Sequence, residues 1–113
     1  MNGITQIVIL SYIYEHIQEL PWDYALYIEG NPPWVETTRC AVLDPDDVGD
    51  YEETPQFAVA NLLRYALSIA DIQDIYDNAR IQLGTVSIET FIQALNYYFL
   101  NDAFIIFTSN DFQ

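Results

Sequence analysis

The stretch RYALSIADIQDIYDNARIQLG, residues 64–84, decides the fold, because it reads as a short strand that runs directly into a helix. Residues 64–69 can also extend a preceding helix, but we favour the strand. Ser68 stands three residues before Asp71, the S-x-x-D spacing of a helix cap, and Gly84 is suited to end the helix. The expected apolar stripe is Ile72, Ile75, Tyr76, Ala79 and Leu83. A helix with one apolar face implies another layer beneath it.

Two further strands are predicted upstream of this unit. DYALYIEG, residues 23–30, alternates in polarity and stops at Gly30, and TTRCAVLD, residues 37–44, is the second candidate. The NPPW sequence between them is typical of a turn. Residues 24–44 therefore read as a β-hairpin.

Two more helices and one more strand are predicted further along the chain. Thr54 and Pro55 suit the N-cap and first position of a helix over QFAVANLL, residues 56–63. Ser87 can cap a later helix. The stripe of that helix is Ile88, Phe91, Ile92, Leu95 and Phe99. DAFIIFT, residues 102–108, reads as a buried strand.

The N-terminal segment ITQIVILSYIYEHIQ, residues 4–18, is apolar on nearly every face. Its length favours a helix ended by Pro21, although its β-branched residues make a strand possible for part of it. A helix that is apolar all round is buried on more than one side, so the segment is also a candidate homodimer contact. The run is too short to cross a bilayer and lacks the basic start of a signal peptide, so no membrane association and a cytoplasmic location are expected.

Together these elements predict one α+β domain over residues 1–113, with a single sheet of about three or four strands and about four helices packed against it. Apolar residues make up 51% of the chain, which is enough for a core without disulfides or metals. The single Cys40 rules out an internal disulfide, and its apolar neighbours indicate a buried small side chain rather than a reactive thiol.

The charge balance is the outstanding feature of the composition. Seventeen acidic residues face three arginines and no lysine, for a formal net charge of −14. Such an excess concerns solubility and partners rather than fold. The plain interpretation is a halophilic or simply soluble acidic protein, and the sharper one is a protein that meets a basic partner. Direct nucleic-acid binding is not expected, because it requires cationic groups that displace phosphate counterions.

Six carboxylates lie in VLDPDDVGDYEETP, residues 42–55, without a basic residue among them. They are Asp44, Asp46, Asp47, Asp50, Glu52 and Glu53. Aligned on a calcium-binding loop, the stretch matches at Asp44, Asp46 and Gly49 but fails at Val48 and at Pro55, where a bidentate glutamate is needed. No specific calcium site is expected, and a solvated connector or a docking surface remain as alternatives.

No other group of residues has the pattern of a chemical site. His16 and Cys40 are the only soft metal ligands, and they lack the paired spacing of a metal site. With one histidine, one cysteine and no G-x-S-x-G motif, the chain also lacks the residues of a nucleophilic catalytic site. Scattered glycines and the absence of lysine exclude a phosphate cradle. Glycosidases use a pair of carboxylates, but among seventeen acids some pair will always lie at a suitable distance, so such a pair does not indicate this activity. The sequence predicts no metal, no cofactor and no enzymatic activity.

Two acidic surfaces are the candidate partner-binding sites. The first is the acidic stretch, with Tyr51 as its anchor, since a tyrosine between Asp50 and Glu52 is expected to be exposed. The second is the polar face of the helix after Ser68. It carries Asp71, Asp74 and Asp77. Carboxylates accept bidentate bonds from arginine, and complementary fields raise association rates. Trp22 and Trp34 are better explained as core residues.

Four segments carry a resemblance to a known group of proteins. They are ELP at 19–21, VLDPDDV at 42–48, PQFAVANLLRYALSIADIQDIYDNAR at 55–80 and ALNYYFLNDAFI at 94–105. On them the chain resembles small acidic bacterial proteins that are similar to immunity proteins, the inhibitors that protect a cell from its own secreted or contact-delivered toxin, as in contact-dependent growth inhibition. The resemblance implies a cytoplasmic, non-catalytic protein cognate to one toxin.

We therefore expect an immunity protein that binds and neutralises a basic toxin domain, with a nuclease as the favoured class, because a nuclease active site must be basic to bind a polyanion. The alternative is a DNA-mimicking inhibitor of a restriction or CRISPR defence system. A mimic needs carboxylates spaced along an extended surface. Here six of the seventeen acids lie within ten residues, which suits a compact docking patch better.

Overall fold

The computed structural model describes residues 4–107, which form one sheet with helices on both faces. In chain order the elements are β1 (Ile4–Ile9), α1 (Leu10–Glu15), the 3₁₀ turn η1 (Ile17–Glu19), β2 (Ala25–Ile28), β3 (Arg39–Leu43), α2 (Gln56–Ala60), β4 (Arg64–Ser68), α3 (Ile69–Leu83) and α4 (Ile88–Asn101). The expected α+β fold is confirmed.

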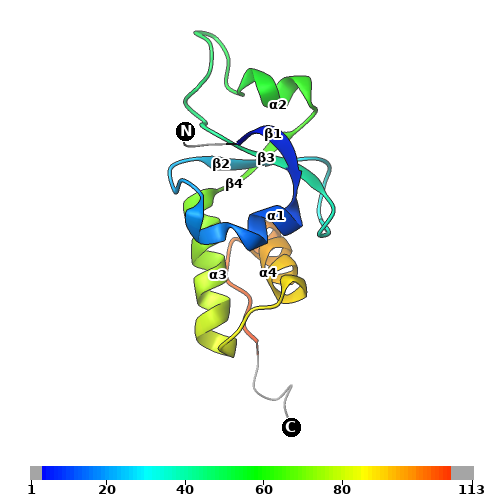
Figure 1. The fold of residues 1–113 in the computed structure, drawn as a ribbon, viewed down its shortest axis with the longest axis vertical. Helices are drawn as coiled ribbons and strands as arrows, with labels where there is room; N and C mark the ends of the chain where they lie inside the picture. The colour runs from blue at the N-terminus through cyan, green and yellow to red at the C-terminus, as the bar shows by residue number, and fades with distance from the viewer. Residues whose placement is uncertain (1–3, 108–113) are drawn as a thin grey trace.

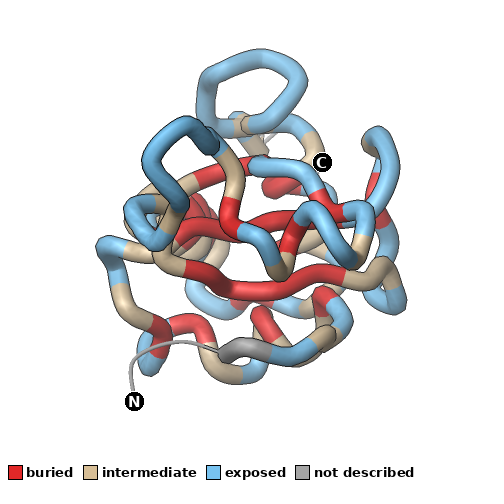
Figure 2. Tube along the Cα trace, turned by 90° about the horizontal axis from the view of Figure 1, so that it is seen from above, coloured by how far each residue is buried: buried red, intermediate tan, exposed pale blue. Residues whose placement is uncertain are grey.

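The sheet is antiparallel, with the strand order β1-β3-β2-β4. Tyr27 of β2 lies opposite Ala41 of β3 on one side and Tyr65 of β4 on the other. The predicted hairpin of β2 and β3 and the predicted short strand β4 are both confirmed. The two central strands are buried at nearly every position because both sheet faces are covered. Figure 2 shows these buried strands beneath exposed loops.

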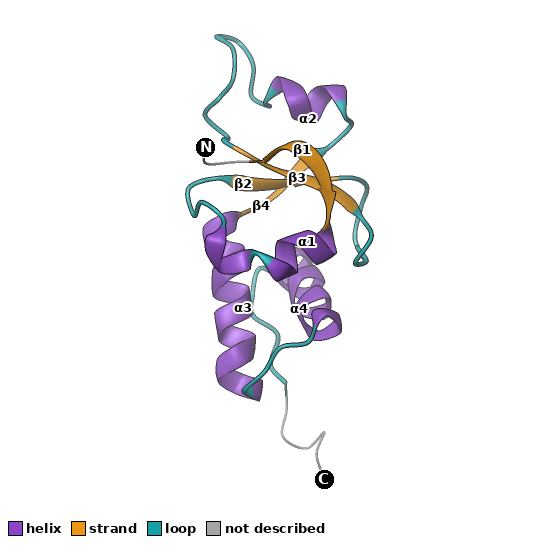
Figure 3. Ribbon diagram, in the orientation of Figure 1, coloured by secondary structure: helices purple, strands orange, loops and turns teal. Residues whose placement is uncertain are grey.

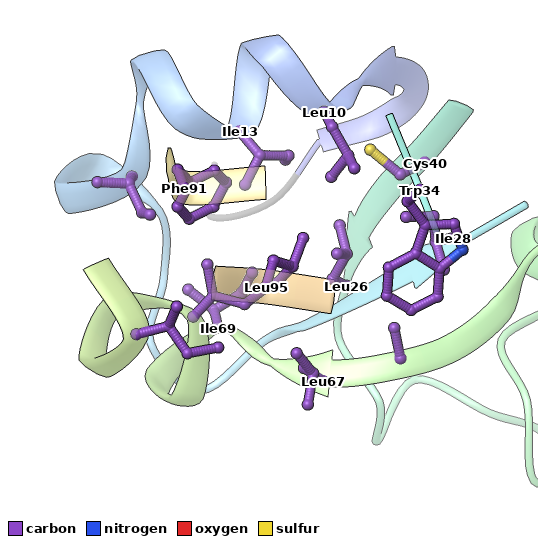
Figure 4. Packing of buried hydrophobic residues seen from close by; sticks show 14 of the residues in the cluster. Leu10, Ile13, Leu26, Ile28, Trp34, Cys40, Leu67, Ile69, Phe91 and Leu95 are labelled. Carbon is purple, nitrogen blue, oxygen red and sulfur yellow. The ribbon is translucent and has the colours of Figure 1, made fainter. Parts of the chain in front are cut away.

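The molecule has three layers (Figure 1). Helices α1, α3 and α4 cover one face of the sheet, and the main core lies between them and the strands. In Figure 4, Leu10 and Ile13 of α1 gather with Phe91 and Leu95 of α4 and with Ile69 of α3. On the other face α2 covers a smaller core. Its buried members are Ala25, Tyr27, Ala41, Leu43, Ala58 and Leu63.

The unit of β4 and α3 forms as its sequence predicts. The Ser68 hydroxyl accepts a hydrogen bond from the Asp71 N–H at 3.0 Å, which satisfies a free donor of the first helical turn. The residues of α3 that are buried against the core are Ile69, Ile72, Ile75 and Ala79. Gly84 ends the helix with φ +86°, a left-handed conformation that favours glycine. Ser87 caps α4 in the same way, accepting from the Thr90 N–H at 3.1 Å.

The N-terminal segment is a strand followed by a short helix, so the single helix over residues 4–18 is wrong for its first half. The alternative of a strand for part of the segment is confirmed by β1, which pairs with β3. The chain bends at Leu10, where the N–H groups of Leu10 and Ser11 donate to the carbonyls of Thr38 and Glu36 at 3.1 and 2.9 Å. These distant acceptors satisfy the free donors of the first turn of α1.

Two other local predictions are corrected. The N-cap residue of α2 is Pro55 rather than Thr54, without a side-chain cap, and the helix ends at Ala60 because the chain reverses at Leu62 with φ +61°. The segment DAFIIFT is not a strand over its described part. Gln82 of α3 binds its backbone instead, donating to the Ile105 carbonyl at 2.9 Å and accepting from the Phe107 N–H at 3.0 Å.

No helix between residues 4 and 107 is both long enough and apolar enough to span a membrane.

Candidate functional site

The acidic stretch forms a long loop that rises from the end of β3 to the start of α2 (Figure 3). Its first half is folded by Asp44. One carboxylate oxygen of Asp44 accepts from the Asp46 N–H at 2.9 Å, and its carbonyl accepts from the Asp47 N–H at 3.1 Å. This is an Asx-turn, in which a side chain replaces a backbone acceptor. Asp44 therefore serves the loop structure rather than the surface.

The second half of the loop is folded by a reciprocal pair. The Gly49 N–H donates to the Glu52 carboxylate at 3.1 Å, and the Glu52 N–H donates to the Gly49 carbonyl at 3.1 Å. A Cβ atom at position 49 would stand 2.9 Å from that same carboxylate oxygen, so a larger residue there would force the Glu52 side chain to shift. Glu52 is thus a second carboxylate that is used internally.

The remaining acids of the loop do not take part in its internal hydrogen bonds through their side chains. Asp46, Asp47, Asp50 and Glu53 are exposed, and no described side chain between residues 6 and 107 forms a hydrogen bond or an ion pair with their carboxylates. Tyr51 lies among them with its side chain 100% exposed, as the sequence predicts. The loop presents four uncompensated carboxylates around one bare aromatic ring.

The arginines of the chain do not neutralise this loop. Arg39 lies 2.8 Å from Glu29, and Arg80 lies 4.0 Å from Asp77. Arg64, at the start of β4, bonds to an amide oxygen rather than to a carboxylate. None of the three arginines is therefore paired with a carboxylate of the acidic loop in the described part of the chain.

The second predicted surface, on α3, is less free. Asp74 is exposed, but Asp77 lies beside Arg80 and receives a hydrogen bond from the Gln18 amide at 3.5 Å. Asp71 is half-buried at the first turn of the helix. Only part of this face is open to a partner.

The structure does not join the two acidic surfaces. The loop lies above the sheet and α3 lies below it (Figure 1). The two surfaces accordingly affect the pKa values of different tyrosines. Burial raises the pKa of Tyr27, and Tyr65, Asp44 and Asp46 raise that pKa further. On the far side, burial raises the pKa of Tyr98, assisted by Asp71, Asp102 and Asp74.

Asp102 lies on the same acidic surface as Asp71 and Asp74, although the sequence pattern does not predict it there. It follows α4, and the antiparallel packing of α3 against α4 brings it near Asp71 and Asp74. No local pattern marks it, because 28 or more residues separate it from the other two.

The tryptophans divide between core and surface. Trp34 is 4% exposed, as expected, whereas the expectation for Trp22 is wrong, since its side chain is 69% exposed. The Trp22 carbonyl accepts from the Ala70 N–H at 3.2 Å, which holds the residue at the start of α3 with its ring in solvent. Trp22 adds an exposed aromatic side chain near the lower surface.

The described residues hold no group of three histidine, cysteine, aspartate or glutamate side chains placed to bind a metal ion. Cys40 is fully buried, and burial raises the pKa of its thiol to about 12, so it is a core residue with an unreactive neutral thiol. His16 stacks on Tyr12 with ring centroids 4.1 Å apart and pairs with Glu19 at 3.2 Å.

Comparison with known proteins places the chain in one family. Residues 7–107 match the model of the Domain of unknown function (DUF7716), so the chain belongs to this family. No curated protein and no solved structure matches it. The description of the family assigns it no activity.

Proposed function

We propose that this DUF7716 member is an immunity protein that binds and neutralises a cognate basic toxin domain in the cytoplasm, with a nuclease as the favoured toxin. The observation that carries the proposal is the fully exposed Tyr51 within a loop of exposed carboxylates that the chain itself does not balance. Large aromatic side chains are strong interface anchors, and charges around them steer association.

The internal hydrogen bonds of the loop support a binding role. A loop that must be ordered on binding loses affinity, because fixing its backbone and side chains costs conformational entropy. Here Asp44 and Glu52 already hold the backbone through hydrogen bonds at 2.9 and 3.1 Å. The two acids that shape the loop and the acids that face solvent thus have separate tasks.

The charge of the loop fits a cationic partner in particular. Asp46, Asp47 and Asp50 stand within five residues, so their mutual repulsion is relieved when arginines or lysines approach. A nuclease must carry such residues in its active site, and an acidic inhibitor there gains rapid capture and blocks the substrate at once. Asp71 and Asp74 on α3 form a secondary contact in this proposal.

The N-terminal segment is not needed as a contact. Leu10, Ile13 and Ile17 are buried in the core of the same chain, and Val8, Tyr12 and Tyr14 pack against that core, so these side chains need no second copy to cover them. The proposal therefore assigns partner binding to the acidic loop and leaves homodimer formation aside.

The test compares two variants with the same net charge. The loop variant carries Asp46→Asn, Asp47→Asn and Asp50→Asn, and it spares Glu52 because that carboxylate folds the loop. The control variant carries substitutions at three exposed acids elsewhere. They are Glu15→Gln, Asp23→Asn and Glu36→Gln. Each variant changes the formal charge from −14 to −11 by removing three carboxylates.

Affinity capture from the native host with the wild type and both variants then identifies the partner by mass spectrometry. We expect one basic protein that binds the wild type and the control variant but associates much more slowly with the loop variant. Expressed alone, this protein should arrest growth, and coexpression with the wild type should restore it. A captured restriction or CRISPR component would instead support the DNA-mimicking alternative, and equal loss of binding in both variants would remove the loop as the contact.

A further inference from the structure

A pocket of about 230 Å³ lies at the end of the sheet where β2 ends and β4 begins. Its walls include Asn31 from the turn after β2, Arg64 and Tyr65 from β4, Trp34 from the loop before β3, and Phe99 from the last turn of α4. The pocket is separate from the acidic loop, which leaves the sheet at the opposite end of β3 (Figure 3).

The charge of the pocket is opposite to that of the molecule. The chain has seventeen acids, but none of those in its described part lines the pocket. The one charged residue of the described lining is Arg64, which is basic. Arg39 and Arg80 each have a carboxylate within 4.0 Å, whereas no described carboxylate lies that close to Arg64. One N–H group of the guanidinium bonds to the Asn31 side chain, which leaves other donors for a ligand.

The aromatic walls are fixed before any ligand arrives. The Trp34 indole N–H donates to the Gly30 carbonyl at 3.1 Å, so its only polar atom is satisfied and its ring serves as an apolar surface. Trp34 and Phe99 meet edge to face with ring centroids 4.8 Å apart. The Tyr65 ring is 55% exposed, and Tyr27 supports it edge-on at 5.6 Å.

From this geometry we propose that the pocket binds a carboxylate attached to a single aromatic ring. A guanidinium donates two parallel hydrogen bonds to the oxygens of a carboxylate, and the ring packs against the aromatic walls. The volume is below the range of about 300 to 1,000 Å³ that holds drug-sized ligands, which suits one ring and excludes a nucleotide. A phosphate dianion fits less well, because a single guanidinium leaves one of its charges unpaired in an acidic protein.

The full chain offers an internal reference for the binding test. Trp34 lines the pocket, whereas Trp22 precedes β2 and lies at the other end of that strand. In a titration with phenylacetate followed by ¹⁵N–¹H NMR, we expect the indole signal of Trp34 to shift to saturation and that of Trp22 to remain in place. Phenylacetamide has the same shape without the charge, so it should bind at least about tenfold more weakly.

Arg64→Gln should weaken phenylacetate binding by about tenfold or more, because it removes the charge-assisted hydrogen bonds. The matched control is Arg80→Gln, which removes the same charge from α3 outside the pocket and should leave the affinity unchanged. Both arginines are exposed, and circular dichroism establishes that each variant is folded. An unmoved Trp34 signal, equal binding of phenylacetamide, or equal weakening by Arg80→Gln would overturn the proposal.

The same chemistry can come from a small metabolite or from a polypeptide that ends in phenylalanine. A second titration with the peptide Gly-Gly-Phe and its amidated form separates these sources. Tighter binding of the free peptide than of phenylacetate indicates a chain end, and the reverse indicates a small molecule. Equal binding of the free and amidated peptides would contradict carboxylate recognition. These outcomes do not depend on whether the acidic loop binds a toxin.

Discussion

The side-chain amide of Asn96 pairs with both main-chain polar groups of Trp34, 62 residues away. Its oxygen accepts from the Trp34 N–H at 2.8 Å, and its nitrogen donates to the Trp34 carbonyl at 3.0 Å. A side chain of α4 thus satisfies the backbone N–H and carbonyl of Trp34, as a neighbouring strand would in a sheet. The contact fixes the wall of the Arg64 pocket and ties α4 to the sheet end.

Asn96→Ala should lower the free energy of unfolding by about 2 to 3 kcal/mol, because it leaves two partly buried backbone groups without partners. Urea denaturation followed by circular dichroism measures the change. Asn101→Ala is the matched control, since that side chain makes only one exposed hydrogen bond, to the Tyr97 carbonyl at 3.0 Å. The control should change stability by less than about 0.5 kcal/mol, and equal losses would contradict a special role for Asn96.

The loop variant with Asp46→Asn, Asp47→Asn and Asp50→Asn should be more stable than the wild type at low ionic strength. The three carboxylates are exposed without a described cationic partner, so neutralising them removes repulsion. Thermal melts should show a Tm a few degrees higher in dilute buffer. The difference should vanish near 1 M salt, where the screening length is about 3 Å. A gain that persists in high salt would mean that the charges are not its cause.

Cys40 should resist thiol reagents in the folded protein and react on unfolding. Burial raises the pKa of its thiol from 9.0 to about 12, so the folded state favours the neutral form. Its contribution to stability is therefore complete below pH 9 and is lost as the pH rises toward about 12, because the unfolded thiol ionises first. Ellman's reagent at pH 8, with and without urea, provides the measurement. Rapid labelling of the native protein would show that the side chain is accessible.

Leu62→Gly should stabilise the protein by about 1 kcal/mol. Leu62 has φ +61° with a side chain that is 79% exposed, so it carries the strain of a left-handed conformation without the benefit of burial. Ala60→Gly in the neighbouring helix α2 is the control, and it should destabilise by about 1 kcal/mol, since glycine is unfavourable in a helix. If both glycines destabilise, Leu62 makes a contribution to stability that its exposure does not reveal.

Local patterns were sufficient for the central part of the fold. The sequence signals of β2, β3 and β4 and of helices α3 and α4 each lie within a few consecutive residues. Ser68 bonds to Asp71, and Gly84 adopts a positive φ, at the positions that the spacing indicates. Such signals act over one helical turn, so they are readable without tertiary contacts.

The sequence also determined the character of the surface. The excess of carboxylates and the lack of lysine guarantee an acidic exterior, and a tyrosine between two acids is exposed because burying it would bury its charged neighbours. The residues of the acidic loop were therefore identifiable in advance. Their division into structural acids, such as Asp44 and Glu52, and solvent-facing acids was not, because it depends on loop geometry.

Tertiary structure alone decided where ambiguous apolar segments belong and which distant residues meet. The carbonyls of Thr38 and Glu36 accept hydrogen bonds where the strand of residues 4–9 gives way to the helix of residues 10–15. Gln82 binds the backbone of Ile105 and Phe107, in a segment that the sequence predicts as a strand but that pairs with no described strand. The Arg64 pocket is likewise assembled from three separate parts of the chain, residues 28–34, residues 64–65 and Phe99. An apolar run can be buried as helix, strand or loop, and its hydrogen-bond partners, which the sequence does not reveal, select among them.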